Sequence, residues 1–403
     1  MRIAINGLSA RMGGGAAYIS NLLEHLSKID HDNEYVVFTS PERKDSFRVD
    51  AANFSIIAPR FPGGAVVRRA IWEQLILPVL IKRYRIDVLF SPGGISPVII
   101  TGRCKRINMV QNMAPFCDEL LASYPFSKRK MRFLMLRKLY PLFIATADAS
   151  IFISMDSLNT LRRVTKFDTE KSKVIYHGRN ERLYKPIPKD VAARLIQEQY
   201  GIGGRFVLYV SNIARYKKHL EVVEAYHIIQ ERIAKVERSA NPSEVEQAAS
   251  LFKKVDKLVL AGIMVETSYY HEILKLASRL SIRDEVVYLG QVPQAHLPYL
   301  YSAASVFVFA SICENCPNIL IEAMACGAPI VSSNLGPMLE ICGNAALYFD
   351  PSEPTDIADK MWQVLADERI RRELISNALE NVKRFSWEET ARKTLEVFEE
   401  AMV

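Results

Sequence analysis

Short apolar runs alternate along this chain with longer segments whose apolar residues recur every three to four positions. The short runs predict strands, and the longer segments predict amphipathic helices, such as 17–28 with Ile19, Leu22 and Leu26 on one face. Strands that alternate with helices pair in parallel, with helices on both faces of the sheet. The predicted strands are Arg2–Asn6, Tyr35–Thr39, Phe54–Ala58, Val88–Ser91, Lys105–Val110, Ala149–Ser154, Arg205–Ser211, Lys257–Ala261, Glu285–Gly290, Val306–Ala310, Ile330–Ser333 and Ala346–Phe349.

The pattern begins again near residue 205, after the polar, proline-containing stretch 184–190, which is the expected hinge. A chain of 403 residues is about twice as long as one ordinary domain. We therefore predict two doubly wound, Rossmann-like α/β domains facing each other across a cleft, at residues 1–184 and 185–385. The charged segment 234–256 interrupts the second pattern and is predicted to be a solvated helical insertion.

Composition excludes several classes of protein. No run of about 18 apolar residues predicts a membrane-spanning helix, and the first residues do not resemble a signal peptide. The six cysteines are irregularly spaced, which favours thiols in a reducing cytosol over a disulfide framework. Residues 1–185 carry 29 Lys and Arg against 16 Asp and Glu, so this half should meet an anionic partner. No aromatic and basic recognition motif supports nucleic acid as that partner.

The stretch CENCPNILIEAMACGAPIV, residues 313–331, is the strongest candidate site. It predicts a loop after the buried run Val306–Ala310 and then a helix that starts at Asn318, behind Pro317. A helix N-terminus at the carboxyl edge of a parallel sheet binds anions, because its N–H groups and dipole favour negative charge. Glu314 and Glu322 can accept hydrogen bonds from hydroxyl groups, so the layout suits a nucleotide sugar; a solvated pair of glutamates is the alternative.

The cysteines of this stretch raise a second interpretation. Cys313 and Cys316 have the spacing of half a zinc site, but no matching second pair and no downstream histidine follow. We therefore expect two buried or half-buried thiols. The Asp30-His31-Asp32 motif resembles a metal-binding Asp-x-Asp, but it lies in a polar turn between a helix and a strand. We expect no metal and no other cofactor.

The stretch CENCPNILIEAMACGAPIVSSNLGPMLEICGNAALYFDP resembles the donor-binding region of the family 4 glycosyltransferases, which have the GT-B fold. The residues that carry the resemblance are Glu314, Glu322 and the Ala-Met-Ala-Cys-Gly-Ala-Pro-Ile-Val that follows it, Gly336, Glu340 and Asp350-Pro351. Weaker matches are the glycine loop Gly13–Gly15, KVIYHG at 173–178 and FSWEETA at 385–391.

The resemblance implies roles for individual residues. In that family the first glutamate, here Glu314, contacts the donor sugar, and the second, here Glu322, contacts the ribose. A basic pair holds the diphosphate: Lys217 matches the lysine, whereas Asn212 stands where the arginine is common, and Arg215 in the same loop is its expected replacement. The helix start at Asn318 and Ile319 is expected to complete the donor site.

The first domain is expected to supply the acceptor side. Gly14 and Gly15 can bring backbone N–H groups close to the diphosphate or the acceptor. Gln111 and Asn112 stand where the family often has a histidine, and an amide cannot act as a general base. By resemblance the anomeric configuration is retained, the departing phosphate takes the acceptor proton, and Gln111 orients the sugar. The helix 386–403 is expected to pack back on the first domain.

The segment 125–143, PFSKRKMRFLMLRKLYPLF, mixes six basic residues with apolar ones. It resembles an interfacial amphipathic helix that would place the protein on an anionic membrane surface. The alternative is a domain helix with its apolar side in the core and its basic side in water.

Together these features predict a retaining, metal-independent hexosyltransferase. It would move a sugar from a nucleoside diphosphate to a glycan or lipid-linked acceptor, in assembly of a bacterial surface polysaccharide or glycolipid such as lipopolysaccharide. The expected location is the cytoplasm, either free or on the inner face of the plasma membrane. Two alternatives stay open: a nucleotide-sugar epimerase of the same fold, and a non-catalytic sugar-nucleotide-binding partner subunit.

Overall fold

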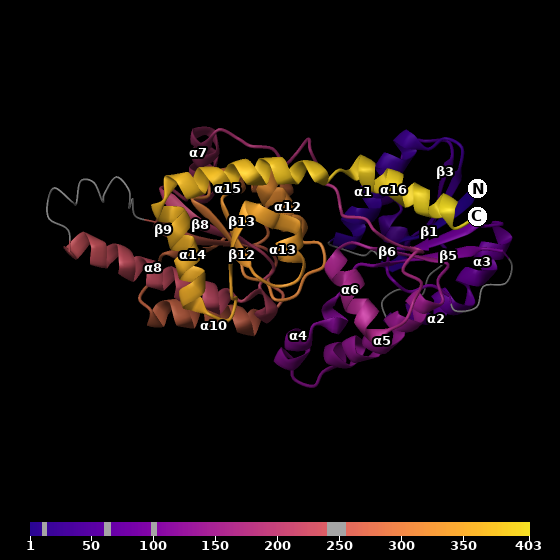
Figure 1. Cartoon of the computed structure of the whole chain (residues 1–403), viewed down its shortest axis with the longest axis horizontal. Coiled ribbons are helices and arrows are strands. Elements are labelled where there is room, and N and C mark those ends of the chain that lie inside the picture. The colour runs from indigo at the N-terminus through magenta and orange to yellow at the C-terminus, as the bar shows by residue number, and fades with distance from the viewer. Residues whose placement is uncertain (10–13, 60–65, 98–102, 240–254) are drawn as a thin grey trace. The chain divides into compact units, whose positions relative to one another are not determined.

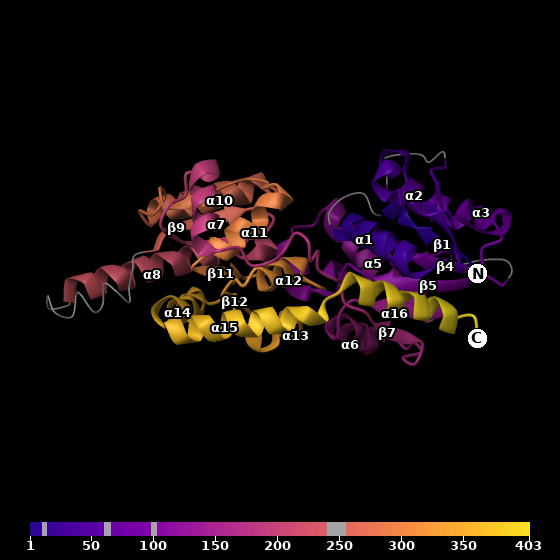
Figure 2. The same cartoon turned by 90° about the horizontal axis from the view of Figure 1, so that it is seen from above.

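The computed structural model describes residues 1–9, 14–59, 66–97, 103–239 and 255–403 of the chain. They form two compact units, one made of Met1–Gly178 with Phe385–Val403 and the other of Arg179–Arg384. We call these the N-terminal unit and the C-terminal unit. Each unit holds one sheet of parallel strands with helices on both faces (Figures 1 and 2). The prediction of two Rossmann-like α/β sheets is confirmed.

The N-terminal unit has a seven-stranded sheet of order β3-β2-β1-β4-β5-β6-β7. Its strands are β1 (Arg2–Asn6), β2 (Glu34–Phe38), β3 (Phe54–Ile57), β4 (Val88–Ser91), β5 (Lys105–Val110), β6 (Ala149–Phe152) and β7 (Ser172–Val174). Its helices are α1 (Gly14–Ile29), α2 (Val66–Leu75), α3 (Leu77–Arg83), α4 (Asp118–Ser123), α5 (Lys128–Ala145), α6 (Met155–Val164) and α16 (Trp387–Glu400).

The C-terminal unit has a six-stranded sheet of order β10-β9-β8-β11-β12-β13. Its strands are β8 (Arg205–Val210), β9 (Val255–Ala261), β10 (Val286–Tyr288), β11 (Val306–Phe309), β12 (Ile330–Ser333) and β13 (Ala346–Phe349). Its helices are α7 (Lys189–Tyr200), α8 (His219–Ser239), α10 (Thr267–Arg279), α11 (Leu297–Ala303), α12 (Asn318–Ala325), α13 (Pro337–Cys342), α14 (Pro354–Ala366) and α15 (Glu368–Asn381).

Both sheets reverse their strand order at one place. The chain builds outward from β1 to β3 and then crosses to β4 on the other side of β1; in the second sheet it builds from β8 to β10 and then crosses to β11. Ligands of doubly wound folds bind beyond the carboxyl ends of the strands at such a switch point. The loops after β1 and β4, and those after β8 and β11, are therefore where sites are expected.

The strands begin and end within about two residues of their predicted bounds, except for one missed strand. The short β7 lies at the edge of the sheet next to β6, and its three residues give too short an apolar pattern to recognise. Helix α8 extends into the segment predicted to be a helical insertion and ends at Ser239. Residues 240–254 of the predicted insertion lie outside the described residues.

The segments 173–178 and 385–391, two of the weaker family matches, pack against each other inside the N-terminal unit. His177 stacks on Trp387 at a centroid distance of 5.7 Å and lies 5.1 Å from the ring of Tyr18 in α1. A Cβ atom on Gly178 would lie 2.1 Å from the backbone nitrogen of Trp387, so only glycine permits this approach. Helix α16 lies beside α1 in both views (Figures 1 and 2). The segments 173–178 and 385–391 therefore match because they build this packing contact.

The region predicted to be a hinge is anchored at its start. Tyr184 is 5% exposed and packs near Tyr301 of α11, and the Ile187 N–H donates to Ser302 Oγ at 3.2 Å. These contacts all lie within the C-terminal unit. In the described residues, no helix is both long enough and apolar enough to cross a bilayer.

Candidate functional site

Two loops meet at the switch point of the C-terminal unit. One follows β8 and includes the short helical turn Arg215–Lys217; the other follows β11 and leads into α12. The Ile312 N–H donates to the Tyr216 carbonyl at 3.0 Å, and the Lys217 ammonium forms an ion pair with the Glu314 carboxylate. The sequence predicted both charged residues separately, and the fold brings them together because β8 and β11 are neighbours.

Lys217 is a buried cation. It is 5% exposed, and its Nζ lies 5.0 Å and 5.2 Å from the ring centroids of Tyr216 and Phe309. The Tyr209 hydroxyl donates to the Lys217 carbonyl at 2.6 Å and fixes the backbone. Burial disfavours the ammonium, but the Glu314 carboxylate, together with Tyr216 and Cys313, outweighs this effect and raises the pKa of Lys217 above its usual value. The side chain is therefore charged and ready for an anionic ligand at neutral pH.

The start of α12 adds a second attraction for anions. Pro317 is its N-cap residue and supplies no side-chain hydrogen bond to the first turn. The N–H groups of that turn, including those of Asn318 and Ile319, point toward the end of the helix where its dipole is positive. Lys217 and the start of α12 thus lie on the two loops that meet here.

Glu322 is held one turn further along α12, among tyrosines. The Tyr301 hydroxyl donates to its Oε2 at 3.3 Å, and the buried Tyr184 side chain is a second neighbour that lowers the pKa of this carboxyl group. Burial raises the pKa of Glu322 to about 7, although both tyrosines favour the ionised form. A carboxyl group in this state can still accept hydrogen bonds from a ribose.

We expect this glutamate to make stability depend on pH. Its pKa is about 7 in the folded chain and 4.5 without the fold, so its contribution is complete below about pH 4.5 and is lost as pH rises through 7. Relative to Glu322→Gln, the wild type should lose about 2.5 kcal/mol of unfolding free energy between pH 5 and pH 8. Denaturant titrations at both pH values measure this, with Glu237→Gln, at an exposed position of α8, as control. Equal pH slopes for wild type and Glu322→Gln would contradict it.

The Arg215 guanidinium is already engaged. Its Nη1 lies 2.9 Å from Glu272 Oε2, its Nε lies 4.0 Å from Glu266 Oε2, and its carbon lies 5.1 Å from the Tyr269 ring centroid. The hydrogen-bonded Glu272 raises the pKa of Arg215. Asn212, in the same loop, is exposed. The structure therefore does not bring Arg215 into contact with the Lys217–Glu314 pair, and its role in binding a diphosphate stays a prediction.

His219, at the start of α8, is a buried neighbour of this site that sequence reasoning did not single out. Its Nε2 lies 3.0 Å from Ser211 Oγ, and its ring stacks on Tyr209 at 4.8 Å. Burial, together with the Lys217 charge, lowers the pKa of His219 to about 3. The imidazole is neutral at physiological pH and acts as packing behind Lys217. The sequence feature that could have identified His219 is its position directly after the Lys217-Lys218 pair.

The candidates of the N-terminal unit follow β1 and β5: Gly14 and Gly15 for the diphosphate or the acceptor, and Gln111 and Asn112 for the acceptor side. Gly15 and Gln111 are close, since a Cβ atom on Gly15 would lie 3.2 Å from Gln111 Oε1. Asn112 is exposed and accepts a hydrogen bond from the Ala114 N–H at 3.1 Å. Gly14 is exposed with open space around it, whereas Gly13 lies outside the described residues. Gly15, Gln111 and Asn112 line one pocket in this unit.

The residues considered as metal ligands have other roles. Asp30, 4% exposed, accepts hydrogen bonds from the N–H groups of Asp32 and Asn33 and from the Tyr35 hydroxyl, so it closes a turn. None of the six cysteines, all within the described residues, forms a disulfide; Cys313 is half-buried and Cys316 buried. Within the described part of the chain, no group of three or more His, Cys, Asp or Glu side chains could hold a metal ion.

Comparison with known proteins gives one consistent picture. A family model described as "Glycosyltransferase Family 4" matches residues 12–182, and one described as "Glycosyl transferases group 1" matches residues 194–381. A curated relative, the O-antigen chain mannosyltransferase B of Escherichia coli, is 38% identical over 124 residues, which are 31% of this chain and 32% of that relative. The chain thus matches about a third of that relative's length.

Solved structures resemble the whole chain. Sucrose-phosphate synthase from Thermosynechococcus elongatus aligns with a TM-score of 0.75 at 21% identity, over 99% of this chain and 98% of that one. Anabaena HepE, solved with UDP and glucose, aligns with a TM-score of 0.71 at 18% identity, over 99% and 100%. At these identities the likeness concerns the fold.

Proposed function

Because the chain belongs to the family 4 glycosyltransferases and has the GT-B fold, we propose that it transfers a sugar from a nucleoside diphosphate to an acceptor hydroxyl. One observation carries this proposal: the buried Lys217 ammonium and the start of α12 lie on the two loops that meet at the switch point of the C-terminal unit. Support also comes from the fold neighbour solved with UDP and glucose. The relative's name points to the assembly of a bacterial surface polysaccharide.

The ion pair suggests how the donor is received. A diphosphate carries more negative charge than one carboxylate, so it competes with Glu314 for the Lys217 ammonium. Once released, Glu314 can accept a hydrogen bond from a hydroxyl of the donor sugar, while Glu322 accepts one from the ribose. Donor binding is thus an exchange of partners at Lys217, which avoids leaving either charge buried alone.

The same groups would act on the reaction. When the glycosidic bond to the donor phosphate breaks, negative charge develops on the leaving nucleoside diphosphate. Lys217 and the N–H groups at the start of α12 stabilise this charge without a metal ion. We propose retention of the anomeric configuration, with the departing phosphate accepting the proton of the acceptor hydroxyl and Gln111 orienting the sugar.

The N-terminal unit offers a surface for a membrane. Helix α5 buries Phe133, Tyr140, Phe143 and Ile144, yet Met131, Leu134, Met135 and Leu142 on the same helix are 41–53% exposed among its basic residues. The expectation of one apolar and one basic face is thus too simple, since apolar residues serve both the core and the surface. Exposed apolar and basic side chains together favour anionic lipid, and we propose that this surface brings the enzyme to a membrane-borne acceptor.

Thermal stability against a panel of nucleoside diphosphates and nucleotide sugars, with a metal chelator present, tests the donor proposal. One donor at a hundred times its dissociation constant should stabilise the wild type by about 2.7 kcal/mol. Lys217→Met should lose most of this gain, whereas Lys235→Met, on the exposed side of α8, should keep it. Stabilisation by no nucleotide, or only after a divalent metal is added, would contradict the proposal as stated.

A further inference from the structure

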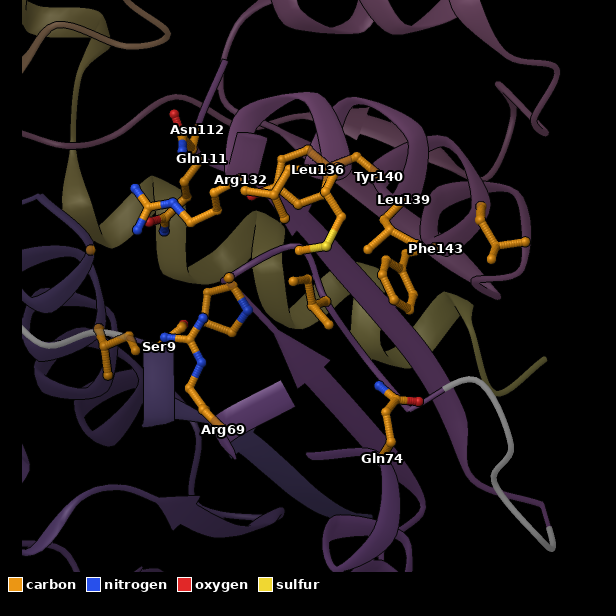
Figure 3. Close-up of a pocket in the computed structure, with 17 residues that line it drawn as sticks. Ser9, Arg69, Gln74, Gln111, Asn112, Arg132, Leu136, Leu139, Tyr140 and Phe143 are labelled. Carbon is orange, nitrogen blue, oxygen red and sulfur yellow. The ribbon is translucent and has the colours of Figure 1, made fainter. Parts of the chain in front are cut away.

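A pocket of about 510 Å³ lies in the N-terminal unit, at the switch point between β1 and β4. Helix α2 contributes Arg69 and Gln74 to its wall, and α5 contributes seven residues from Arg132 to Phe143 (Figure 3). The loops after β1 and β4 close its floor with Ser9 and Gly93, where a Cβ atom on Gly93 would lie 2.4 Å from Ser9 Oγ. The pocket therefore belongs to one unit and is built by its fold.

One end of this pocket is positively charged. Figure 3 shows the Arg69 and Arg132 side chains on the same side of the pocket, with Gln111 nearby. The Arg69 side chain is 17% exposed, and its Nε lies 3.8 Å from the Glu73 carboxylate, which is 2% exposed. Glu73 in turn accepts a hydrogen bond from Asn6 at 3.2 Å, so its position is fixed from behind. Arg69 is thus held by a buried carboxylate that does not itself line the pocket.

Arg132 differs from Arg69 in its surroundings. It is exposed and stacks near the Phe133 ring at 5.4 Å, and it has no carboxylate partner among the residues that the structure describes. Arg69 and Arg132 carry two positive charges, and Glu73 offsets only that of Arg69, so this end of the pocket has a net positive charge. Guanidinium groups match phosphate oxygens in geometry and bind them with paired hydrogen bonds.

The other end of the pocket is apolar. Leu139 and Phe143 line it, and Figure 3 shows both away from the two arginines, with Leu136 closer to Arg132. Met135 and Leu142 also line it and are each 47% exposed, so the apolar wall continues onto the surface of α5. A ligand that fits has an anionic head and a hydrocarbon tail that leaves along this surface.

We propose that this pocket binds the acceptor by a phosphate or diphosphate group attached to a hydrocarbon chain. Arg69 and Arg132 hold the anion, the leucines and Phe143 hold the first carbons, and Gln111 lies where the attached sugar would begin. This rests on the proposed function, in which the N-terminal unit receives the acceptor, and it narrows the acceptor to phosphorylated lipid. A neutral glycan would use neither guanidinium, and a nucleotide would not need the leucine wall.

Binding of dodecyl phosphate to the full chain, below its micelle concentration, tests the proposal; dodecanol and inorganic phosphate are the comparison ligands. Dodecyl phosphate should bind at least tenfold more tightly than either. Arg132→Gln should weaken it about tenfold to a hundredfold, since a hydrogen bond to a charged group is lost. Arg162→Gln, an exposed arginine of α6 away from the pocket, should leave binding unchanged. Equal binding of dodecanol overturns the anionic head, and equal binding of inorganic phosphate overturns the apolar wall.

Arg69→Lys provides a second variant, because it keeps the charge next to Glu73 while removing the planar group. Arg69→Lys should weaken the binding of dodecyl phosphate less than Arg132→Gln does. Unchanged affinity in both arginine variants overturns the assignment. Nucleoside diphosphate binding, measured in the same variants, separates the two proposals. If the nucleoside diphosphate binds but dodecyl phosphate does not, only the assignment of the pocket is wrong. If nucleoside diphosphate binding depends on Arg132 rather than on Lys217, the pocket is a donor site and the acceptor assignment is wrong.

Discussion

Replacing Lys217 with methionine is expected to lower kcat/KM for the donor by about a hundredfold to a thousandfold, the usual effect of removing one group that stabilises a developing anion. Methionine keeps most of the apolar stem between Tyr216 and Phe309 but cannot offset charge on the leaving diphosphate. Initial rates at varied donor concentration measure this. A larger loss in kcat than in donor affinity would place the interaction mainly in the transition state.

Loss of folding must be separated from loss of chemistry in this variant, because it leaves the Glu314 carboxylate buried without a cation. The double variant Lys217→Met/Glu314→Gln removes both charges and should fold normally while remaining slow. Lys235→Met on α8 provides the matched control. Rates within threefold of wild type for Lys217→Met would remove Lys217 from the reaction.

Glu314→Ala is expected to lower the free energy of unfolding by about 3–5 kcal/mol, because it strands a buried ammonium. The Lys217 and Glu314 side chains are only 7% and 17% exposed, so water cannot compensate for the lost partner. Adding Lys217→Met to this variant should recover much of the loss, and the double-mutant cycle measures the coupling between the two charges.

The Arg215–Glu272 pair gives the comparison for this experiment. Its side chains are 40% and 43% exposed, so Glu272→Ala should cost less than about 1 kcal/mol. If Glu314→Ala and Glu272→Ala lower the free energy of unfolding equally, or if the effects of the substitutions at Lys217 and Glu314 simply add, then burial does not strengthen the Lys217–Glu314 pair.

Local patterns predicted every described strand except β7, because an apolar run and the residues that bound it lie within a few positions of each other. The run VFVF, the glycine after α12 and the restart at Arg205 are all local features. The contact between Lys217 and Glu314 is different, since 97 residues separate them. Only the strand order β8-β11, which no local pattern states, brings their loops together.

The same distinction explains which contacts of the candidate site the sequence did not predict. Arg215 remains a candidate for binding the diphosphate, but the sequence does not show that Glu272, on α10, hydrogen-bonds to its guanidinium. Glu322 was expected to meet a ribose, but its enclosure by Tyr184 and Tyr301 comes from segments 138 and 21 residues away. Nothing in the sequence predicted that Arg69 lines a pocket, because an arginine in an amphipathic helix usually faces water.

The packing contact between α1, His177 and Trp387 affects the order in which the two units can fold during synthesis. Residues 385–403 complete the core of the N-terminal unit, yet they follow every residue of the C-terminal unit. A ribosome releases residues in order, and domains usually fold as they emerge, first domain first. Here the order is reversed: Arg179–Arg384 can finish folding while Tyr18 and His177 still wait for Trp387 to be synthesised.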